Sequence, residues 1–309
     1  MPRWTLTLAL LLVGCGSPAT REESAVSTIP LSHAGGDSGA EHLLKVPVVV
    51  NGHATTFVFD TGIGITLVDD DLLARWGIAP ETSYTGKRMS GQEVTVPLAR
   101  VPWLSVAGLR QDDVQVGVWD MDGFLPRTPE FAGVEGFLSL HALAEVAFTL
   151  DYARGALIVE DEASLAARVA AGSVVPLEVH RDGPTLTVFF ELLVPGGPPA
   201  RVELDLGGRA IALDASFMER LGVDPEGEGV KRVEKRDETG FDYTRRFATV
   251  AGPIAPAAAP QLEQRDFTAL FQEIIYDGLI GDDYLSRYTA TFDLPRGRLI
   301  LGPRAPSGE

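Results

Sequence analysis

The sequence predicts an all-β protein with a few short helices, arranged as two similar β-barrel lobes that arose by internal duplication. The 309-residue chain is 45% hydrophobic, which is ample for a packed core. Its apolar residues fall in short runs rich in Val, Leu, Phe and Thr, and Gly, Pro and Asn interrupt these runs as turns interrupt strands. The second half of the chain also repeats the pattern of the first half, which indicates two copies of one unit.

The repeat is visible when the chain is aligned with itself. Residues 60–80 match residues 205–225 at six of 21 positions, and residues 136–159 match residues 278–301 at eight of 24. Composition alone would give roughly one or two identities in each window. The two offsets, 145 and 142 residues, are nearly equal. The matched positions include an acid, turn glycines and a closing hairpin, so each half is expected to form the same kind of lobe.

The composition argues against several classes of function. The formal net charge of −17 repels nucleic acids and anionic lipid headgroups, so we expect no nucleic-acid binding and no membrane binding through the body of the protein. The five histidines are scattered, and the sequence contains no zinc-binding His-Glu-x-x-His helix, phosphate-binding glycine loop or Gly-x-Ser-x-Gly elbow. We therefore expect no metal and no cofactor.

Residues 1–14 are typical of a signal peptide, because a short apolar run follows Arg3 and is too short to span a bilayer. The run ends at Gly14-Cys15, which resembles a bacterial lipoprotein signal. The resemblance implies lipidation of Cys15 and a lipid-anchored protein of the bacterial cell envelope. Gly16, in place of an aspartate, favours the outer membrane. The alternative is an ordinary secretory signal with an incidental cysteine.

Composition divides the rest of the chain into a tether, two lobes and a linker. Residues 15–41 are rich in Ser, Gly, Ala and Glu without periodicity, which predicts a flexible tether. The first lobe is expected over residues 42–161 and the second over residues 174–304. Between them, residues 162–173 are dominated by helix formers and predict a short linking helix.

The first lobe is expected to open with a hairpin, because two strand-like runs flank Asn51-Gly52, a strong two-residue turn signal. The returning strand ends in Asp60. The acids at residues 69–71 are expected to cap a short helix rather than to bind a metal. In order, we expect strands or hairpins over residues 46–50, 55–59, 84–96, 97–118, 146–150 and 156–159.

The second lobe is expected to repeat this order. An apolar strand ends in Asp205, a short helix follows over residues 214–221, and a very polar segment occupies residues 226–246. The expected strands cover residues 177–194, 200–204 and a closing pair around residues 293–297.

The motif in the first lobe resembles that of a known family. Asp60-Thr61-Gly62 ends an apolar strand, a polar hairpin begins 24 residues after Asp60, and Gly-Leu-Ile-Gly at residues 278–281 precedes the closing strands. Together with the duplication, these features resemble the aspartic proteases. The spacing is closer to the compact retropepsin-like lobe of bacterial envelope proteins than to the longer pepsin lobe. The resemblance covers residues 43–303 and implies a monomeric, two-lobed enzyme that acts on a peptide or protein substrate.

Catalysis in this family uses two carboxylates that lie a few ångströms apart and share one proton. One activates a water molecule and the other protonates the scissile carbonyl, without a metal or a covalent intermediate. The resemblance implies that Asp60 is the first carboxylate, Thr61 a tie between the lobes and Gly62 the supporting turn. On the second lobe it implies Asp205 as the other carboxylate and Gly207 as its turn.

The second copy of the motif is degenerate. Leu206 stands where Thr61 stands in the first copy, and a leucine side chain forms no hydrogen bond. One of two ties between the lobes is therefore lost, and Thr61 can be left unpaired. Ile63 and Arg209 also replace the small residues usual after the motif, and Arg209 can hold Asp205 as an ordinary carboxylate.

Three interpretations of function remain open at this stage. In the first, Asp60 and Asp205 form a working dyad of an aspartic endopeptidase. In the second, the protein is a catalytically weakened pseudo-protease that binds peptides or proteins without cutting them. In the third, Asp60 is active only through dimerisation, paired with Asp60 of another molecule.

The hairpin at residues 84–96 also has two interpretations. It is either an ordinary exposed turn or a flap that closes over a bound peptide and excludes water. As a flap, it would use Tyr84 as a donor towards the site, and Gly86 and Gly91 would bracket its tip. Residues 226–246 would then be the second flap, although their many charges favour a solvated face.

Overall fold

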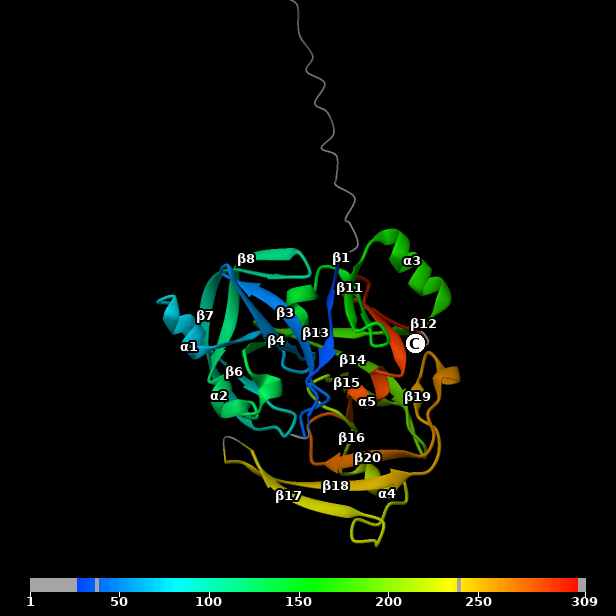
Figure 1. The fold of residues 1–309 in the computed structure, drawn as a ribbon. Helices are drawn as coiled ribbons and strands as arrows, with labels where there is room; N and C mark the ends of the chain where they lie inside the picture. Colours follow the sequence, from blue (N-terminus) through cyan, green and yellow to red (C-terminus); the bar gives the residue numbers. More distant parts are fainter. Residues whose placement is uncertain (1–26, 37–38, 238–239, 305–309) are drawn as a thin grey trace, which may run out of the picture.

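The computed structural model describes residues 27–36, 39–237 and 240–304, which form three β-sheets joined by short helices (Figure 1). The predicted fold class, all-β with a few short helices, is confirmed. The predicted signal peptide, Cys15 and the first part of the predicted tether lie outside the described residues.

The strands of lobe 1 are β2 (Ser32–His33), β3 (Leu44–Val50), β4 (His53–Phe59), β5 (Leu67–Asp69), β6 (Thr82–Lys87), β7 (Glu93–Val106), β8 (Leu109–Trp119) and β9 (Val134–Leu138). They form one sheet in the order β2-β3-β4-β9-β5-β8-β7-β6. The predicted hairpin joins β3 to β4, and Asn51 and Gly52 at its turn have φ values of 48° and 86°. Strands β4 and β9 are parallel, β9 and β5 antiparallel, and β5 and β8 parallel.

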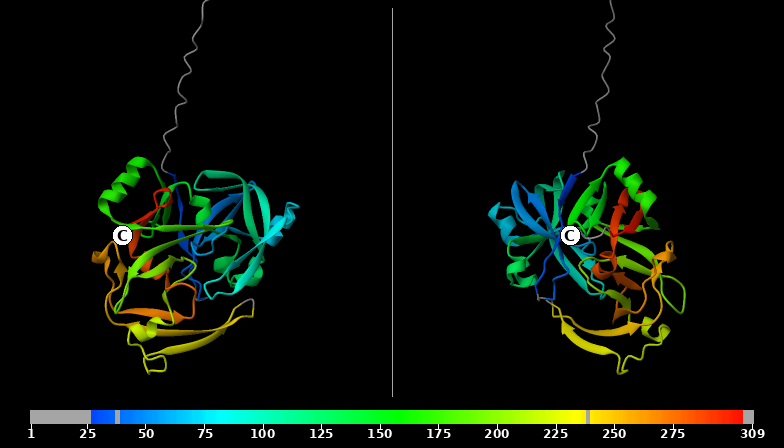
Figure 2. Two further views of the ribbon diagram at one scale, coloured as in Figure 1. Left: turned by 180° about the vertical axis from the view of Figure 1, so that it is seen from behind. Right: turned by 45° about the vertical axis from the view of Figure 1, so that its right-hand side comes forward.

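The strands of lobe 2 are β13 (Glu178–Asp182), β14 (Thr185–Leu193), β15 (Ala200–Leu204), β16 (Ile211–Asp214), β17 (Lys231–Arg236), β18 (Asp242–Val250), β19 (Ala255–Pro256), β20 (Phe267–Gln272) and β21 (Gly278–Ile280). Their order is β13-β14-β15-β21-β16-β20-β18-β17, with β19 beside β14. Strands β15 and β21 are parallel, β21 and β16 antiparallel, and β16 and β20 parallel. Lobe 2 therefore repeats the pairing pattern of lobe 1. The β17–β18 hairpin (yellow) forms its outer edge (Figure 2).

A third sheet joins the lobes and contains β1 (Ser27–Pro30), β10 (Ala147–Asp151), β11 (Ala156–Glu160), β12 (Ser173–Pro176), β22 (Tyr288–Asp293) and β23 (Arg298–Pro303). At its centre β10 pairs with β22, so the closing hairpins of the two lobes lie side by side. Phe148 stacks on Phe292 with 4.9 Å between ring centroids. Thr149 and Thr291 share a buried hydrogen bond of 2.7 Å. Thr149 and Thr291, which the repeat aligns with one another, thus meet as partners.

Ordered structure begins earlier than the sequence predicts. The predicted tether extends to residue 41, but β1 pairs with β11 and β2 pairs with β3 within it. Leu31 and Ala34 are 4% and 8% exposed, so this segment is packed onto the core by its few apolar side chains. A few apolar residues among small polar ones give no recognisable strand pattern, which is why the tether prediction is wrong here.

The helices are short and lie between strands. Helix α1 (Asp70–Arg75) begins after Asp69, whose carboxylate accepts from Leu72 N, so the predicted acidic cap is confirmed. Helix α3 (Glu162–Ala171) lies in the predicted linker, and Asp161 and Ser164 cap it reciprocally. The others are α2 (Met121–Phe124), α4 (Phe217–Arg220), α5 (Asp282–Leu285) and the 3-10 turns η1 (Pro129–Phe131), η2 (Leu140–Leu143), η3 (Pro260–Leu262) and η4 (Leu294–Arg296). Within the described part of the chain, every helix is too short or too polar to cross a membrane.

Candidate active site

Two carboxylates meet where a strand of each lobe ends. Asp60 follows β4 and Asp205 follows β15. The N–H of Asp60 donates to Leu138 O and that of Asp205 to Ile280 O, both at 3.0 Å, so each acid is fixed against the parallel neighbour of its strand. Each carboxyl lies against the turn glycine that follows the other acid, and the charge of Asp205 acts on the ionisation of Asp60. The predicted pair is therefore assembled within one chain.

Glycines allow this approach and supply hydrogen-bond donors. The N–H groups of Gly62 and Gly207 donate to Asp60 Oδ1 at 2.9 and 3.1 Å, and Gly208 N donates to Asp205 Oδ1 at 3.2 Å. A Cβ atom on Gly62 would lie 2.5 Å from Asp205 Oδ1, and one on Gly207 would lie 2.3 Å from Asp60 Oδ2. Any side chain at either position would push the two carboxyls apart. The absence of a side chain is thus a steric requirement of the site.

Thr61 ties the lobes together through backbone atoms. Its buried hydroxyl donates to Leu204 O at 2.7 Å and accepts from Leu206 N at 3.0 Å. The expectation that Thr61 can be left unpaired is therefore wrong, because both of its partners are main-chain groups that any residue provides. Leu206 itself is fully buried in the apolar core. The reciprocal hydroxyl tie from lobe 2 to lobe 1 is missing, as the sequence predicts.

Burial and mutual repulsion set the protonation of the pair. Burial, followed by the charge of Asp205, raises the pKa of Asp60 to about 8, against the bonds from Gly62 and Gly207. Burial also raises the pKa of Asp205, and bonds from Gly208 and Gly207 oppose it. Two carboxyls in contact cannot both ionise at neutral pH, so the pair retains one proton.

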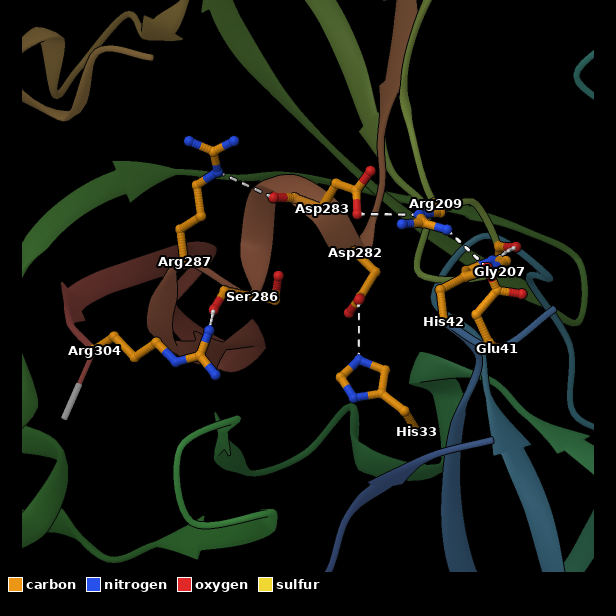
Figure 3. A network of polar contacts seen from close by, with 10 residues as sticks. All are labelled: His33, Glu41, His42, Gly207, Arg209, Asp282, Asp283, Ser286, Arg287 and Arg304. Carbon is orange, nitrogen blue, oxygen red and sulfur yellow. Dashed lines mark hydrogen bonds and ion pairs between the residues drawn. The ribbon is translucent and has the colours of Figure 1, made fainter. Parts of the chain in front are cut away.

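The segment that precedes β3 packs against the turn after Asp205 (Figure 3). His42 Nε2 donates to Gly207 O at 3.1 Å. Arg209 pairs with Glu41 at 2.8 Å and with Asp283 at 3.3 Å. The predicted role of Arg209 in holding Asp205 as an ordinary carboxylate is therefore wrong, because its guanidinium is engaged by other acids.

The predicted flap forms the β6–β7 hairpin, and Tyr84 and the tip of this hairpin contact lobe 2. Tyr84 Oη donates to Asp182 Oδ2 at 3.0 Å, so the expectation that Tyr84 donates towards the dyad is wrong. Near the tip, Ile275 N donates to Met89 O at 2.8 Å.

Glycines shape this hairpin as well. A Cβ on Gly86 would lie 2.9 Å from the Tyr84 ring, and Gly91 has a φ of 79°. Arg88, beside the tip, pairs at 2.9 Å with Asp237. Asp237 follows β17, so the tips of the two hairpins predicted as flaps meet.

Sequence reasoning missed two groups beside the dyad. Glu203 lies two residues before Asp205 on β15 and is 3% exposed. Burial, then the charges of Asp205 and Asp60, raise the pKa of Glu203 well above its usual value. Burial, then the charge of Glu203, raises the pKa of Tyr276 to about 12. An acid in an apolar strand, two residues before the motif, was the visible signal for Glu203, whereas Tyr276 lies in a loop and carries no signal.

Comparison with known proteins agrees with this geometry. The family model for aspartyl proteases matches residues 46–134, a stretch that contains Asp60-Thr61-Gly62 and the β6–β7 hairpin. No curated protein matches the sequence.

Solved structures share the fold of the whole chain. The basic 7S globulin from soybean is 11% identical with a TM-score of 0.52, over 92% of this chain and 99% of that one. Conglutin gamma, a basic 7S globulin from lupine seeds, is 10% identical with a TM-score of 0.51, over 90% and 94% of the two chains. The protein edgp is 9% identical with a TM-score of 0.51, over 93% and 96%. At these identities the likeness concerns the fold alone.

The double role of Thr61 predicts a large effect of removing its hydroxyl. Thr61→Val leaves Leu204 O and Leu206 N buried without a partner and is expected to lower the free energy of unfolding by about 2 kcal/mol or more. Thr61→Ser keeps the hydroxyl and is expected to lose only about 1 kcal/mol, for the missing methyl group. Guanidinium denaturation measures both, and equal losses in the two variants would contradict the assigned bonds.

The raised pKa of Asp60 predicts a dependence of stability on pH. Because this pKa is about 8 in the folded protein and about 4 in an unfolded chain, the folded state binds an extra proton between these values. Its stability therefore falls as the pH rises through this window. In urea denaturation, the stability of Asp60→Asn relative to the unmodified protein should rise by more than about 1 kcal/mol from pH 4 to pH 8. The exposed control Asp122→Asn should show no such trend, and a flat difference for Asp60→Asn would refute the shift.

Proposed function

We propose that this protein is an aspartic-type endopeptidase that hydrolyses peptide bonds with a water molecule activated between Asp60 and Asp205. The observation that carries the proposal is the close approach of two carboxyls, one from each lobe, at the ends of equivalent strands. The match of lobe 1 to the aspartyl protease family supports it.

In the proposed reaction, the ionised carboxyl of the pair takes a proton from a bound water molecule while that water attacks the scissile carbonyl. The protonated carboxyl donates its proton to the carbonyl oxygen as that carbon becomes tetrahedral. The intermediate collapses when the carboxyl that took the proton from water gives it to the leaving amine and the C–N bond breaks. The other carboxylate takes back a proton from a hydroxyl of the tetrahedral carbon, so a new carboxyl end and a new amino end are released and the pair again holds one proton. Gly62 and Gly207 hold the Asp60 carboxyl in place with their N–H groups, so little reorganisation accompanies the proton transfers.

The proposed enzyme acts as a single two-lobed chain. Asp205 of the same molecule already occupies the place that a second copy of Asp60 would take in a dimer. We further propose, from the sequence, that Cys15 is lipidated and anchors the enzyme to the bacterial cell envelope, with the outer membrane favoured. A peptide or protein of that compartment is the proposed substrate.

A second candidate function is a pseudo-protease that binds a peptide or protein without cutting it. Two observations favour it. Leu206 removes one hydroxyl tie between the lobes. The β6–β7 hairpin is also joined to lobe 2 through Tyr84, Arg88 and Met89, which restrains the motion that a flap needs.

The dyad predicts a specific loss of cleavage. Asp60→Asn and Asp205→Asn should each lower kcat/KM on a mixed peptide library by more than about a hundredfold, because each removes one partner of the acid–base pair. Cleavage by the unmodified protein should be highest in acid and vanish as the pH rises past about 8, where the shared proton is lost. The exposed Asp122→Asn serves as the control. Equal turnover in the dyad variants and the control would remove proteolysis from consideration.

Leu206→Thr separates the enzyme from the pseudo-protease. If the dyad already works, the variant should cleave at a rate within about threefold of the unmodified protein, because Thr61 keeps both of its partners. It should also unfold more easily, by about 1–3 kcal/mol, because a hydroxyl replaces buried apolar volume. Leu206→Val controls for the lost volume. A gain in cleavage of tenfold or more with Leu206→Thr alone would identify a disabled protease.

A further inference from the structure

The proposed reaction leaves one buried carboxyl beside the dyad unused. Side chains two residues apart in a strand point from the same face, so Glu203 lies on the same side of β15 as Asp205. It is 3% exposed, and among the described residues no hydrogen bond or ion pair joins its carboxyl to the protein, although the carboxyl oxygens keep some contact with solvent. A buried carboxyl without a partner is costly to the folded protein. Its place beside two acids of a candidate active site suggests that a ligand provides the missing partner.

Aromatic rings stand next to this carboxyl. Phe189 of β14 is directly opposite Glu203 in the sheet. The ring of Tyr276 packs edge-on against Phe189, with 5.1 Å between the centroids. Tyr276 and Asp205 are only partly buried, so both of these neighbours of Glu203 are in contact with solvent. The combination of a carboxyl and aromatic rings is one that binds cations.

The cation already present on this face covers the Phe189 ring but does not bond Glu203. Arg201, two residues before Glu203, bonds Glu178 through Nε and Nη2, each at 2.8 Å. Its guanidinium lies 3.6 Å from the centroid of the Phe189 ring. Arg201 influences the charge of Glu203 from a distance but gives it no bond. It also shows, within this protein, that a carboxylate and the Phe189 ring together hold a basic side chain.

We propose that Glu203 is a specificity-determining residue that selects a substrate with a lysine or arginine side chain next to the scissile bond. The inference rests on the proposed function, since it concerns the same site. An ammonium or guanidinium group beside Glu203 would give this carboxyl its missing hydrogen bond. It would also place one positive charge among three clustered acids, Asp60, Asp205 and Glu203. A neutral or acidic side chain would do neither.

Binding of a cation beside Glu203 is coupled to the loss of the proton on the Glu203 carboxyl. The groups that face Glu203 are Asp205 and Arg201 on its own strand, Asp60 from lobe 1 and Tyr276 from the loop before β21. Without a ligand, Glu203 stays protonated well above the usual pH range of a glutamate. A substrate cation favours the ionised form, so its binding releases this proton. The affinity for a lysine peptide should therefore rise with pH, while that for an uncharged analogue should not.

The test uses peptides that cannot be cut, so that binding is measured apart from proteolysis. Hydroxyethylene isosteres replace the central bond of matched peptides that carry lysine, norleucine or glutamate on either side of it. Titration calorimetry with the full protein at pH 5 and pH 7, in buffers of different ionisation enthalpy, gives both affinity and proton release. The variants are Glu203→Gln, Glu203→Leu and the control Glu191→Gln, which removes an exposed carboxylate from β14 of the same sheet. Thermal melting verifies that each variant is folded.

The expected result is that the lysine peptide binds about tenfold more tightly than the norleucine peptide at pH 7 and releases a proton. In Glu203→Gln and Glu203→Leu, the lysine and norleucine peptides should bind within about twofold of one another, and the proton release should disappear. In Glu191→Gln, the preference and the proton release should both persist. Equal binding of the lysine and norleucine peptides, or a preference unchanged by Glu203→Gln, overturns the inference, as does the absence of binding by the whole series. The cleavage assays on Asp60→Asn and Asp205→Asn test the proposed peptidase activity separately. A Glu203-dependent lysine preference without any cleavage would leave the inference standing and the peptidase refuted.

Discussion

The structure depends on the close approach of two strand ends, one from each lobe. At Gly62 and Gly207 the approach leaves no space for a Cβ atom, and Thr61 bonds across the boundary to the main chain on both sides of Asp205. These contacts need the lobes in one relative position. The sheet shared by both lobes supplies it, because β10 and β22 pair residue by residue and stack Phe148 on Phe292. A rigid shared sheet on one side thus fixes a small distance between carboxyls on the other.

The same approach concentrates acids that water would otherwise separate. Asp60, Asp205 and Glu203 lie within each other's electrostatic influence, and burial raises the pKa of all three. The fold tolerates this only because protons remain on some of them and because the N–H groups of Gly62, Gly207 and Gly208 bond the carboxylates. Such a site is less stable than an apolar one would be, and this is the usual character of sites that do chemistry rather than hold structure.

The duplication made the two lobes predictable from the sequence, but the side-chain contacts between the lobes were not predictable. Asp60 and Asp205 could be located because an acid followed by a glycine recurs after an apolar strand in each half. The glycine is required by the local backbone turn, so it is visible in the sequence at a fixed spacing. The partners of Thr61 escaped prediction, since they are main-chain groups of Leu204 and Leu206 and leave no trace in residue identity. The partner of Tyr84 lies in the other lobe, 98 residues away, and no local pattern encodes it. The shared sheet escaped for the same reason.

Leu206 shows how an asymmetric site can still be complete. In a symmetric arrangement each lobe would offer one hydroxyl and receive one. Here the hydroxyl comes only from Thr61. Its partners in lobe 2 are the carbonyl of Leu204 and the N–H of Leu206, which β15 and the turn after it hold in place. A second hydroxyl at position 206 would need its own partners in a region where the leucine is fully buried and packs in the core. The leucine exchanges one hydrogen-bonded tie for apolar packing, and the geometry of the carboxyls survives because the remaining tie and the two glycines are sufficient to define it.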